Sequence, residues 1–444
     1  MSGNSRLLDP LERWYWVFGN VSPLNGVARC RFEGNLKTES VQHAIGVVQK
    51  RHPLLRSNIK LDKKNRNPRF EVQAEMNVEV IKERLEGKPN AWVEAVKQGY
   101  LNKPFNTSIG PLFKVVLFEY GGGTDLILIA SHTIIDATGI MSLLKEIVLL
   151  AGDPTVKMDS YDLSASFSDR FPSQFNGLFA FLKTLCLQLK IELFSFLKKP
   201  IQLPIDKYVE FQDRRTNFIH KELSQDQTKS LVAACKAENT SVHAALCTAL
   251  IFATLTDKLV KEKHAHRKNV SVGIGSPVNL REDLLPQVDD ASLGIFVASF
   301  FTFASKVDQK AFWDVARDFR NDMLIQKENN EPFTIMNFVR RTMPHTAETA
   351  GSYMKFLDGK GPGNLCISNL GAYDFPDHSG EHQISGAQFI AETSVTGLWV
   401  STANTSHNQL FWNFSYTKDM VSDDRATSLA NACIKILLEY TRAH

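Results

Sequence analysis

The sequence predicts an α/β (α+β) fold built from two lobes that a long connecting segment joins. Its 444 residues exceed what a single hydrophobic core usually serves. Segments with the two-residue period of strands alternate with segments of helical period in both halves of the chain. Because the composition changes between about 151 and 216, we expect a first lobe over 1–165, a crossover segment over 166–216 and a second lobe over 217–444.

The first half of the chain begins with a helix and a strand. Residues 7–19 have helical spacing and several aromatic side chains, and we expect this helix to pack on the body of the protein. Residues 24–34 alternate apolar and polar side chains, which is typical of a strand. A helix over 37–52 then ends before Pro53, because proline cannot continue it. Residues 68–73 are typical of another strand.

A glycine-rich turn joins the next two strands. Residues 110–120 and 125–132 are the strands, and the sequence GGGT between them predicts a hairpin. Residues 138–150 carry apolar side chains at helical spacing. The residues from His132 to Asp136 therefore form a turn between a buried strand and a helix.

The second half has its own helices and strands. Residues 222–259 show two helical patterns joined at the sequence NTS, and residues 422–441 form a final amphipathic helix. The strand candidates between them are 270–280, 292–303, 364–370, 386–392, 398–404 and 409–417.

The crossover segment contains an unusually apolar helix over 171–200. Polar residues recur there only as a narrow stripe, while phenylalanines and leucines fill the rest. So wide an apolar face must be buried against the protein body, an aliphatic substrate or a membrane surface. Core packing is the usual case. The sharper hypothesis is that this helix lines or guards the entrance for a lipid-like substrate and makes peripheral membrane contact.

Composition excludes several classes of protein. A net charge of +3 gives no electrostatic footprint for nucleic acid as a main partner. The six cysteines lack the close spacing of a zinc site or a redox dithiol, so free thiols in a reducing compartment are expected. The first twenty residues contain charges that a secretory signal lacks, and no stretch has about 18 uncharged apolar residues. We expect a soluble, cytoplasmic protein.

His132 and Asp136 are the candidate catalytic residues. Histidine titrates nearest neutrality, so it can take a proton from a hydroxyl or amine and return it within one cycle. An aspartate four residues later could hold the turn or neutralise a nearby cation. The five-residue pattern alone is weak, because most histidines have packing or surface roles.

The chain resembles the superfamily of chloramphenicol acetyltransferase, the plant BAHD acyltransferases, alcohol acetyltransferases and the condensation domains of peptide synthetases. Its members carry an HxxxD motif on such a strand-to-helix turn. Further stretches agree with the superfamily in order, and the resemblance covers most of the chain. These stretches are RHPLLRS at 51–57, KPFNTSIGPLFKVVLF at 103–118, SPVNLRED at 276–283, LGIFVAS at 293–299 and CISNLGAYD at 366–374.

The resemblance implies two lobes like those of chloramphenicol acetyltransferase, with mixed sheets and an active-site channel between them. It implies that His132 deprotonates the acceptor and that Asp136 forms an ion pair with Arg281, although a solvated arginine is the alternative. Ser131 stands where condensation domains usually have a second histidine, and Ala137 where a glycine often follows the aspartate. The DFGWG element of BAHD enzymes is absent, so the alcohol acetyltransferase-like branch fits better.

Acyl transfer also needs an oxyanion donor and a site for the acyl donor. Ser368 and Asn369, at a predicted strand end, are the oxyanion candidates, and a polar turn is the alternative. The densest basic run, at 258–268, could contact the phosphates of coenzyme A, although a solvated loop is the default for such a run. The residues expected to bind this cosubstrate are Lys261, Lys263, Arg267 and Lys268.

The favoured function is transfer of an acyl group from a coenzyme A thioester to a hydroxyl acceptor. No G-x-S-x-G elbow is present, so direct attack is expected rather than an acyl-enzyme. One alternative is a condensation enzyme that a carrier protein supplies, and another is a binding module with an idle histidine. We expect no metal and no permanently bound cofactor, a small or lipid-like alcohol and acyl-coenzyme A as partners, and a monomer.

Overall fold

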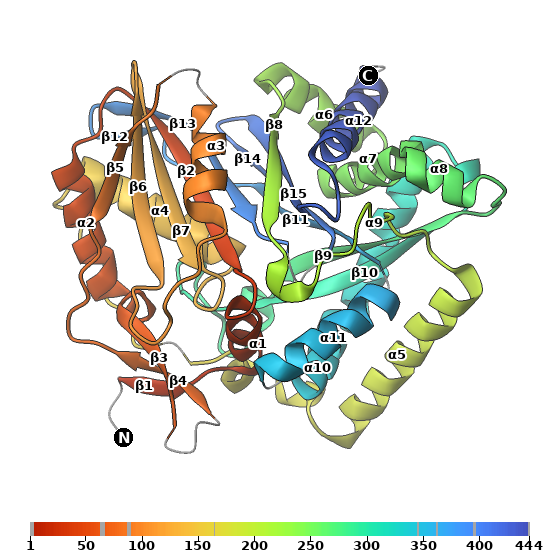
Figure 1. Ribbon diagram of the computed structural model, residues 1–444, viewed down its shortest axis with the longest axis horizontal. Coiled ribbons are helices and arrows are strands. Elements are labelled where there is room, and N and C mark those ends of the chain that lie inside the picture. The colour runs from red at the N-terminus through yellow and green to blue at the C-terminus, as the bar shows by residue number, and fades with distance from the viewer. Residues whose placement is uncertain are drawn as a thin grey trace.

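Two six-stranded sheets lie next to each other in the computed structural model and divide the protein into two lobes (Figure 1). The structure describes residues 4–62, 67–86, 90–163, 165–343, 346–360, 363–393 and 397–442. Helices cover both sheets. The expected mixed α/β fold with two sheet-rich lobes is confirmed.

The first sheet has the strand order β12-β13-β2-β7-β6-β5. Helices α2 and α4 cover one of its faces, and α3 with the short π-helical turn at 97–101 covers the other. The bounds are β2 Asn25–Glu33, α2 Thr38–Arg51, β5 Val80–Arg84, α3 Ala91–Val96, β6 Phe113–Tyr120, β7 Gly123–Ser131, α4 Ala137–Gly152, β12 His378–Ser379 and β13 His382–Ala391.

Strand β7 is buried along its whole length, which explains its continuous apolar sequence. Leu126 and Leu128 pack in the core below α2 and α4. Ile127 and Ile129 point to the opposite face and pack with Trp92 of α3. This strand, paired with β2 and β6 on its two sides, carries the chain from the middle of the first lobe to His132.

The second sheet has the order β10-β9-β11-β14-β15-β8. Helices α6, α7, α9 and α12 supply much of the core on one face. The bounds are β8 Thr216–Glu222, α6 Gln225–Ala237, α7 Val242–Thr256, α8 Lys258–His264, β9 Ser271–Asn279, β10 Val297–Ser305, α9 Phe312–Glu328, β11 Leu365–Ala372, β14 Trp399–Ser406, β15 Gln409–Thr417 and α12 Asp423–Thr441.

The second half of the sequence contributes strands to both sheets. Strand β13 pairs antiparallel with β2, so that Ile384 lies opposite Phe32 and Ala391 opposite Gly26. Residues 378–391 fall within the range expected for the second lobe but complete the first sheet. The chain returns to the second sheet at β14, which lies beside β11.

Three helices close the space between the lobes on one side. They are α1 Pro10–Gly19, α10 Glu331–Thr342 and α11 Ala347–Lys360. Trp14 and Phe18 of α1 share a core with Phe333 and Met336 of α10, so the first helix packs on the body as expected. A small sheet of β1 Ser5–Leu7, β4 Pro68–Val72 and β3 Ser57–Leu61 lies beside them (Figure 1).

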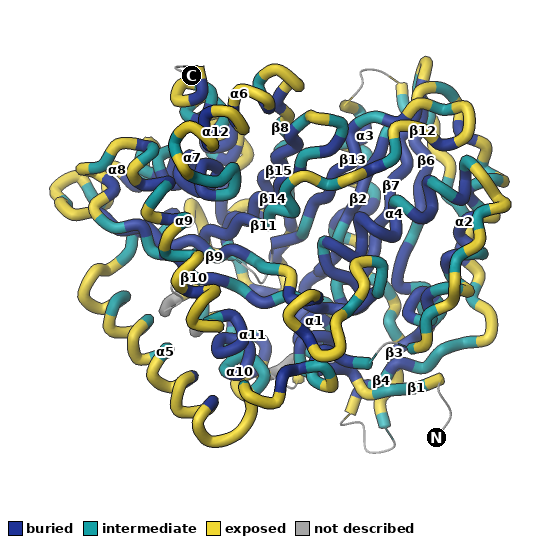
Figure 2. The backbone as a smooth tube through the Cα atoms, turned by 180° about the vertical axis from the view of Figure 1, so that it is seen from behind, coloured by how far each residue is buried: buried dark blue, intermediate teal, exposed yellow. Residues whose placement is uncertain are grey.

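Helix α5, Gly177–Lys198, runs along the outer edge of the molecule (Figures 1 and 2). One side packs on α10 and β10, where Phe194 lies 4.5 Å from Phe303 between ring centroids. The other side, called here the apolar face of α5, is exposed. The helix is therefore not fully buried against the body of the protein. This face consists of Leu178, Phe179, Phe181, Leu182, Leu185, Leu189, Leu193, Phe196 and Leu197.

Neither α5 nor any other single helix of the described chain is long and apolar enough to cross a membrane. Only the pair α6 and α7, bent by 99° at their junction, reaches the required length and composition, and only when both are counted together.

Candidate active site

The turn from His132 to Asp136 leads from β7 into α4, as the sequence predicts. The backbone N–H of His132 donates to the Leu24 carbonyl at 3.0 Å, which ties the turn to the start of β2. Asp136 is the N-cap of α4, and its Oδ1 accepts a hydrogen bond from the Gly139 N–H at 2.9 Å. The aspartate therefore fixes where the turn ends and the helix begins.

Asp136 also forms a two-pronged ion pair with Arg281 of the second lobe. The two guanidinium nitrogens lie 2.8 and 2.9 Å from the two carboxylate oxygens. Both side chains are almost completely buried, at 1% and 0% exposure. The carboxylate accepts a further bond from the Phe296 N–H at 2.9 Å, and the guanidinium donates to the Ser292 carbonyl at 3.0 Å.

This network makes physical sense of the buried charges. A buried carboxylate is costly unless a cation and several donors compensate for the lost water, and the bidentate arginine supplies both. The ion pair implied by the family resemblance is therefore present. It joins the histidine turn of the first lobe to the end of β9 and the segment before β10 in the second.

His132 itself stacks on Tyr15 of α1, with 4.0 Å between ring centroids and 18° between the ring planes. Burial lowers the pKa of the imidazole below its usual value of 6.5, and the negative charge of Asp136 opposes this shift only in part. The ring is therefore neutral at neutral pH and can accept a proton.

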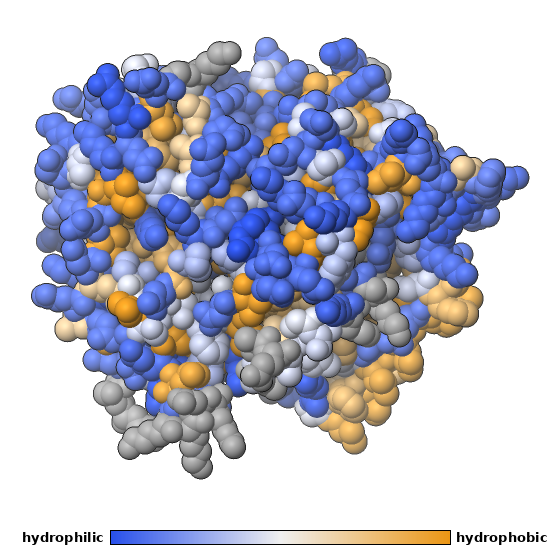
Figure 3. Space-filling model, viewed as in Figure 1, coloured by the Kyte–Doolittle hydropathy of each residue, from blue (hydrophilic) through white to orange (hydrophobic). Residues whose placement is uncertain are grey.

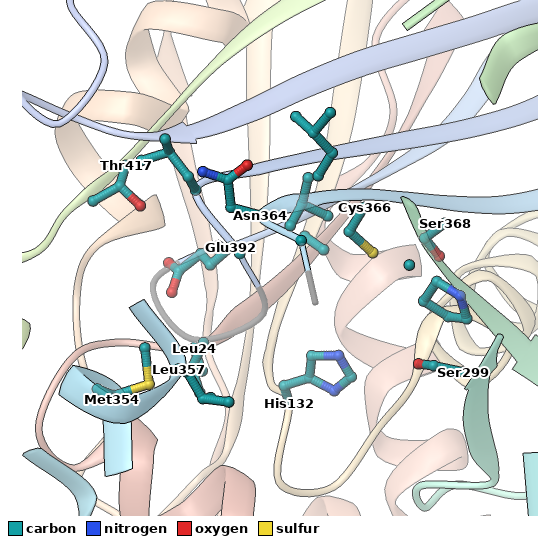
Figure 4. Close-up of a pocket in the computed structure, with 18 of the residues that line it drawn as sticks. Leu24, His132, Ser299, Met354, Leu357, Asn364, Cys366, Ser368, Glu392 and Thr417 are labelled. Atoms are coloured by element: carbon teal, nitrogen blue, oxygen red, sulfur yellow. The ribbon is translucent and has the colours of Figure 1, made fainter. Parts of the chain in front are cut away.

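His132 lies on the wall of a cavity of about 830 Å³ between the two lobes (Figure 4). The first lobe contributes Gly26 of β2 and Ile140 of α4, and the second contributes residues of β9, β10 and β11. Helices α1, α10 and α11 supply further side chains, including Met336 and Met354. Most of these side chains are apolar, as is typical of small-molecule sites.

Strand β11 faces His132 across the cavity (Figure 4). Because successive side chains of a strand point to opposite faces, Cys366 and Ser368 lie on the cavity wall and Ile367 lies in the core of the second lobe. Burial raises the pKa of the Cys366 thiol to about 12, so this cysteine stays protonated. Asn369 does not reach the cavity. Its Oδ1 instead accepts the Gly371 N–H at 2.9 Å, which is the polar turn expected as its alternative.

The sequence analysis missed several polar residues on the cavity wall, among them Ser299 and Glu392. Ser299 of β10 and Glu392, just after β13, lie on opposite sides of His132 in Figure 4. Neither residue belongs to a motif, and a lone serine or glutamate in a strand-like segment carries no spacing signal. Only the arrangement of strands in space brings them to the cavity that His132 also lines.

Glu392 is a buried carboxyl group whose hydrogen-bond partner is Asn25. Its Oε2 accepts the Asn25 backbone N–H at 2.9 Å, and its Oε1 lies 3.4 Å from the Asn25 side-chain nitrogen. Burial raises the pKa of this carboxyl well above its usual 4.5, although the bonds from Asn25 and the charge of Arg215 partly oppose the shift. Asn25 lies opposite Ser131 in the first sheet, so this carboxyl belongs to the sheet end that carries the histidine turn.

The four basic residues expected to bind coenzyme A have different surroundings. Lys263 of α8 lines the cavity, whereas Lys261 and Lys268 are exposed outside it. Arg267 donates to the carbonyl of Lys198 at the end of α5. The basic run is thus a short helix and its C-terminal end at the edge of the cavity. Within the described part of the chain, no three His, Cys, Asp or Glu side chains are grouped so that they could hold a metal ion.

Models of two known protein families match two segments of the chain. The family model of the condensation domain matches residues 19–151, which include the histidine turn. A family model described as phthiocerol/phthiodiolone dimycocerosyl transferase C-terminus matches residues 212–323, which include Arg281. A search of curated proteins found no significant match.

Solved structures share the fold over almost the whole chain. The epimerization domain from the third module of tyrocidine synthetase B aligns with a TM-score of 0.70 and 16% identity, covering 99% of this chain and 96% of its own. Polyketide synthase associated protein 5 from Mycobacterium tuberculosis gives 0.68 and 14%, covering 98% and 100%. The trichothecene 15-O-acetyltransferase from Fusarium sporotrichioides gives 0.74 and 12%, covering 98% and 95%.

These identities are low, so the solved structures establish the fold and not a substrate. The two family matches fall in different lobes, and each contains one partner of the buried Asp136–Arg281 pair. Taken together, the two partial family matches and the fold show that the chain is similar to condensation domains and acyltransferases and has their chloramphenicol acetyltransferase-like fold.

Proposed function

We propose that this protein is an O-acyltransferase that moves an acyl group from a coenzyme A thioester to the hydroxyl group of an apolar acceptor. The observation that carries the proposal is the placement of His132. Its neutral imidazole lies on an inter-lobe cavity, in a turn that the buried Asp136–Arg281 pair holds in place.

In the proposed reaction, His132 accepts the proton of the acceptor hydroxyl while the oxygen attacks the thioester carbonyl. A tetrahedral intermediate forms, and its collapse breaks the carbon–sulfur bond. The imidazolium then returns the proton to the leaving thiolate. Asp136 does not touch the substrate in this scheme, because Arg281 and two backbone N–H groups occupy its carboxylate. Its role is to position the turn.

A hydroxyl group facing His132 would stabilise the oxyanion of the intermediate. Ser368 is the candidate that the cavity supports, since it lines the wall opposite the imidazole (Figure 4). Ser299 lies on the neighbouring side and could bind the same oxygen. Removal of one such donor typically lowers the rate by about 10² to 10³. Asn369 is not part of this proposal, because it turns away from the cavity.

The placement of α8 supports coenzyme A as the source of the acyl group. Lys263 lies on the cavity wall, with Lys261 and Lys268 exposed nearby, so cations are available where phosphates would emerge from the cavity. The acceptor is expected to be apolar apart from its hydroxyl, because most of the lining is apolar.

The test is release of free thiol from acetyl-coenzyme A and longer acyl-coenzyme A donors with a panel of alcohols. The His132→Ala variant should lose at least about 10² in kcat/KM, the usual contribution of a general base. Unchanged turnover in this variant would reject the mechanism. An absence of turnover with every alcohol would favour a binding module with an idle histidine.

The donor can be tested separately. The triple change Lys261→Gln, Lys263→Gln and Lys268→Gln should raise KM for acetyl-coenzyme A and leave KM for acetyl-N-acetylcysteamine unchanged, because the shorter thioester has no phosphates. An equal effect on both donors would remove the phosphate role. Turnover only with a loaded carrier protein would instead support the condensation alternative, whose fold the synthetase domains share.

A further inference from the structure

The apolar face of α5 is the most conspicuous hydrophobic surface that the described chain leaves exposed. In Figure 3 it forms a continuous band along one edge of the molecule, while polar residues dominate most of the surface around it. Leu178, Phe179 and Phe196 are exposed at 75%, 72% and 73%, so the helix turns whole side chains to water. Exposed apolar surface of this extent marks an interaction site.

The width of this face distinguishes between its possible partners. A second helix would need a narrow seam of apolar residues at seven-residue steps. Such a series is present in Leu182, Leu189 and Phe196, but it covers only the middle of the exposed face. Phe179, Phe181 and Leu197 instead widen the face on both sides of that seam. A broad, flat apolar face fits a planar surface better than a single helix.

Positive charges border this face along its length. Lys183 lies 5.5 Å from the Phe179 ring. Lys190 follows seven residues later on the same side of the helix, where it is exposed and also pairs with Glu331 of α10 at 3.4 Å. The guanidinium of Arg341, on α10, lies 5.1 Å from the Phe181 ring at the opposite border. At the C-terminal end, Arg267 contacts the Lys198 carbonyl and brings the basic run of α8 next to α5.

We propose that α5 docks this protein on an anionic lipid membrane, with its apolar face in the interface and the bordering cations at the lipid headgroups. Helices that lie in a membrane surface have this composition, with leucine and phenylalanine on the inserted side and lysine and arginine at the borders. Anionic lipid headgroups carry the charge opposite to that of the bordering lysine and arginine side chains. Each such cation that lies near the membrane surface strengthens the binding.

The position of α5 relative to the cavity agrees with this assignment. None of its residues lines the cavity, so the helix does not have the lining role, whereas the guarding role stays a prediction. It packs on α10, which contributes Ile335, Met336 and Val339 to the cavity wall. The chain then leaves α5 and contributes residues 202–205 to the same wall. If the proposed transferase function holds, the membrane would present acceptors dissolved in lipid at a distance of one helix, α10, from the cavity that His132 lines.

Vesicle binding tests the docking surface without requiring catalysis, so its outcome is independent of the proposed reaction. The full chain is sedimented with phosphatidylcholine vesicles that contain or lack a third of phosphatidylserine. We expect binding to the vesicles with phosphatidylserine and weaker binding to phosphatidylcholine alone. The double variant Phe179→Gln, Phe196→Gln should weaken binding on the order of a hundredfold. The double variant Lys183→Gln, Arg341→Gln should weaken it about thirty-fold, and only on the anionic vesicles.

The matched control is the double variant Leu7→Gln, Val232→Gln. These side chains are 55% and 50% exposed on β1 and α6, which lie away from α5 in Figures 1 and 2, and their loss should not change binding. Circular dichroism melting checks that all variants are folded. Failure of the wild type to bind either vesicle, or equal binding by the α5 variants, overturns the proposal. So does a dimer in sedimentation equilibrium that the Phe179, Phe196 variant dissociates, because a second copy would then be the occupant.

Discussion

At the scale of single residues, His132 owes its chemistry to what surrounds it. Tyr15 on one ring face and the walls of the cavity remove water from the imidazole, and this burial lowers its pKa. Asp136 is near enough to oppose the shift, yet Arg281 compensates its charge. The same ion pair that fixes the turn thus limits how far the aspartate can raise the pKa of the histidine.

The lowered pKa predicts the shape of the pH–rate profile. A general base works only when unprotonated, so kcat/KM should fall as the pH drops through the pKa of His132. Because this pKa lies below 6.5, the midpoint of the acidic limb should also lie below 6.5. The measurement is kcat/KM across the acidic range with an acceptor that does not titrate there. A midpoint at or above 6.5 would contradict the assignment of the base.

Glu392 gives a second prediction, which concerns stability. A raised pKa in the folded state means that folding favours the protonated carboxyl, so its contribution is complete below about pH 4.5 and is lost as the pH rises through the folded pKa. The Glu392→Gln variant cannot ionise and keeps the acceptor for the Asn25 N–H. Its free energy of unfolding should therefore exceed that of the wild type by a margin that grows as the pH rises above 4.5.

Urea unfolding at several pH values measures this margin. The exposed Glu94→Gln, in α3, serves as the control and should show no comparable trend. A constant difference between Glu392→Gln and the wild type across the range would show that Glu392 titrates normally in the folded protein.

At the scale of elements, the strand-to-helix turn depends on one side chain with two structural roles. Asp136 caps α4 and compensates Arg281, whose guanidinium is completely buried. Asparagine can keep the cap, because its carbonyl oxygen still accepts from the Gly139 N–H. It cannot compensate the guanidinium, which would remain as an isolated buried charge.

The Asp136→Asn variant should therefore lose about 3 to 5 kcal/mol of unfolding free energy, the usual cost of breaking a buried ion pair. Denaturant titration measures the loss. Asp153→Asn, at the exposed C-terminal end of α4, is the matched control and should change stability little. A loss below about 1 kcal/mol for Asp136→Asn would mean that Arg281 finds another partner or water.

The elements that the sequence revealed are those with strong local signals. The hairpin of β6 and β7 and the helix α4 follow directly from alternation, glycines and helical spacing. Strand β5, where three of five residues are exposed, has only a weak signal and was not anticipated. Helices α9 and α10 were not anticipated either, although both carry apolar residues at helical spacing. For α5 the apolar pattern was clear, but the sequence could not say which side of the helix the body would cover.

The candidate site divides in the same way. His132, Asp136 and Arg281 belong to motifs at fixed places along the chain, so resemblance sufficed to find them. Glu392 and Ser299 depend on which strands become neighbours, and strand pairing between distant segments is not encoded in a local period. Asn369 was chosen for its position at a predicted strand end. Its side chain points away from the cavity, because it follows Ser368 and successive side chains of a strand point to opposite faces.

At the scale of the whole molecule, two features bind the lobes together. Strand β13 from the second half of the chain completes the first sheet beside β2, and the Asp136–Arg281 pair crosses between the lobes. Without β13, strand β2 would become an unpaired edge with buried apolar side chains exposed. Neither lobe is therefore a self-sufficient folding unit, although chains of this length often unfold in separate steps.

This coupling predicts that both lobes lose protection at the same urea concentration. Cys30 in β2 of the first lobe and Cys433 in α12 of the second are buried free thiols, whereas Cys186 on α5 is exposed. A thiol reagent applied across a urea series, with labelling located by mass spectrometry, should give one shared midpoint for Cys30 and Cys433. Cys186 should react at every concentration, which confirms that the reagent works without unfolding. If Cys30 became reactive at a clearly lower urea concentration than Cys433, the first lobe would unfold while the second stays folded, and the inserted strand would not be enough to couple them.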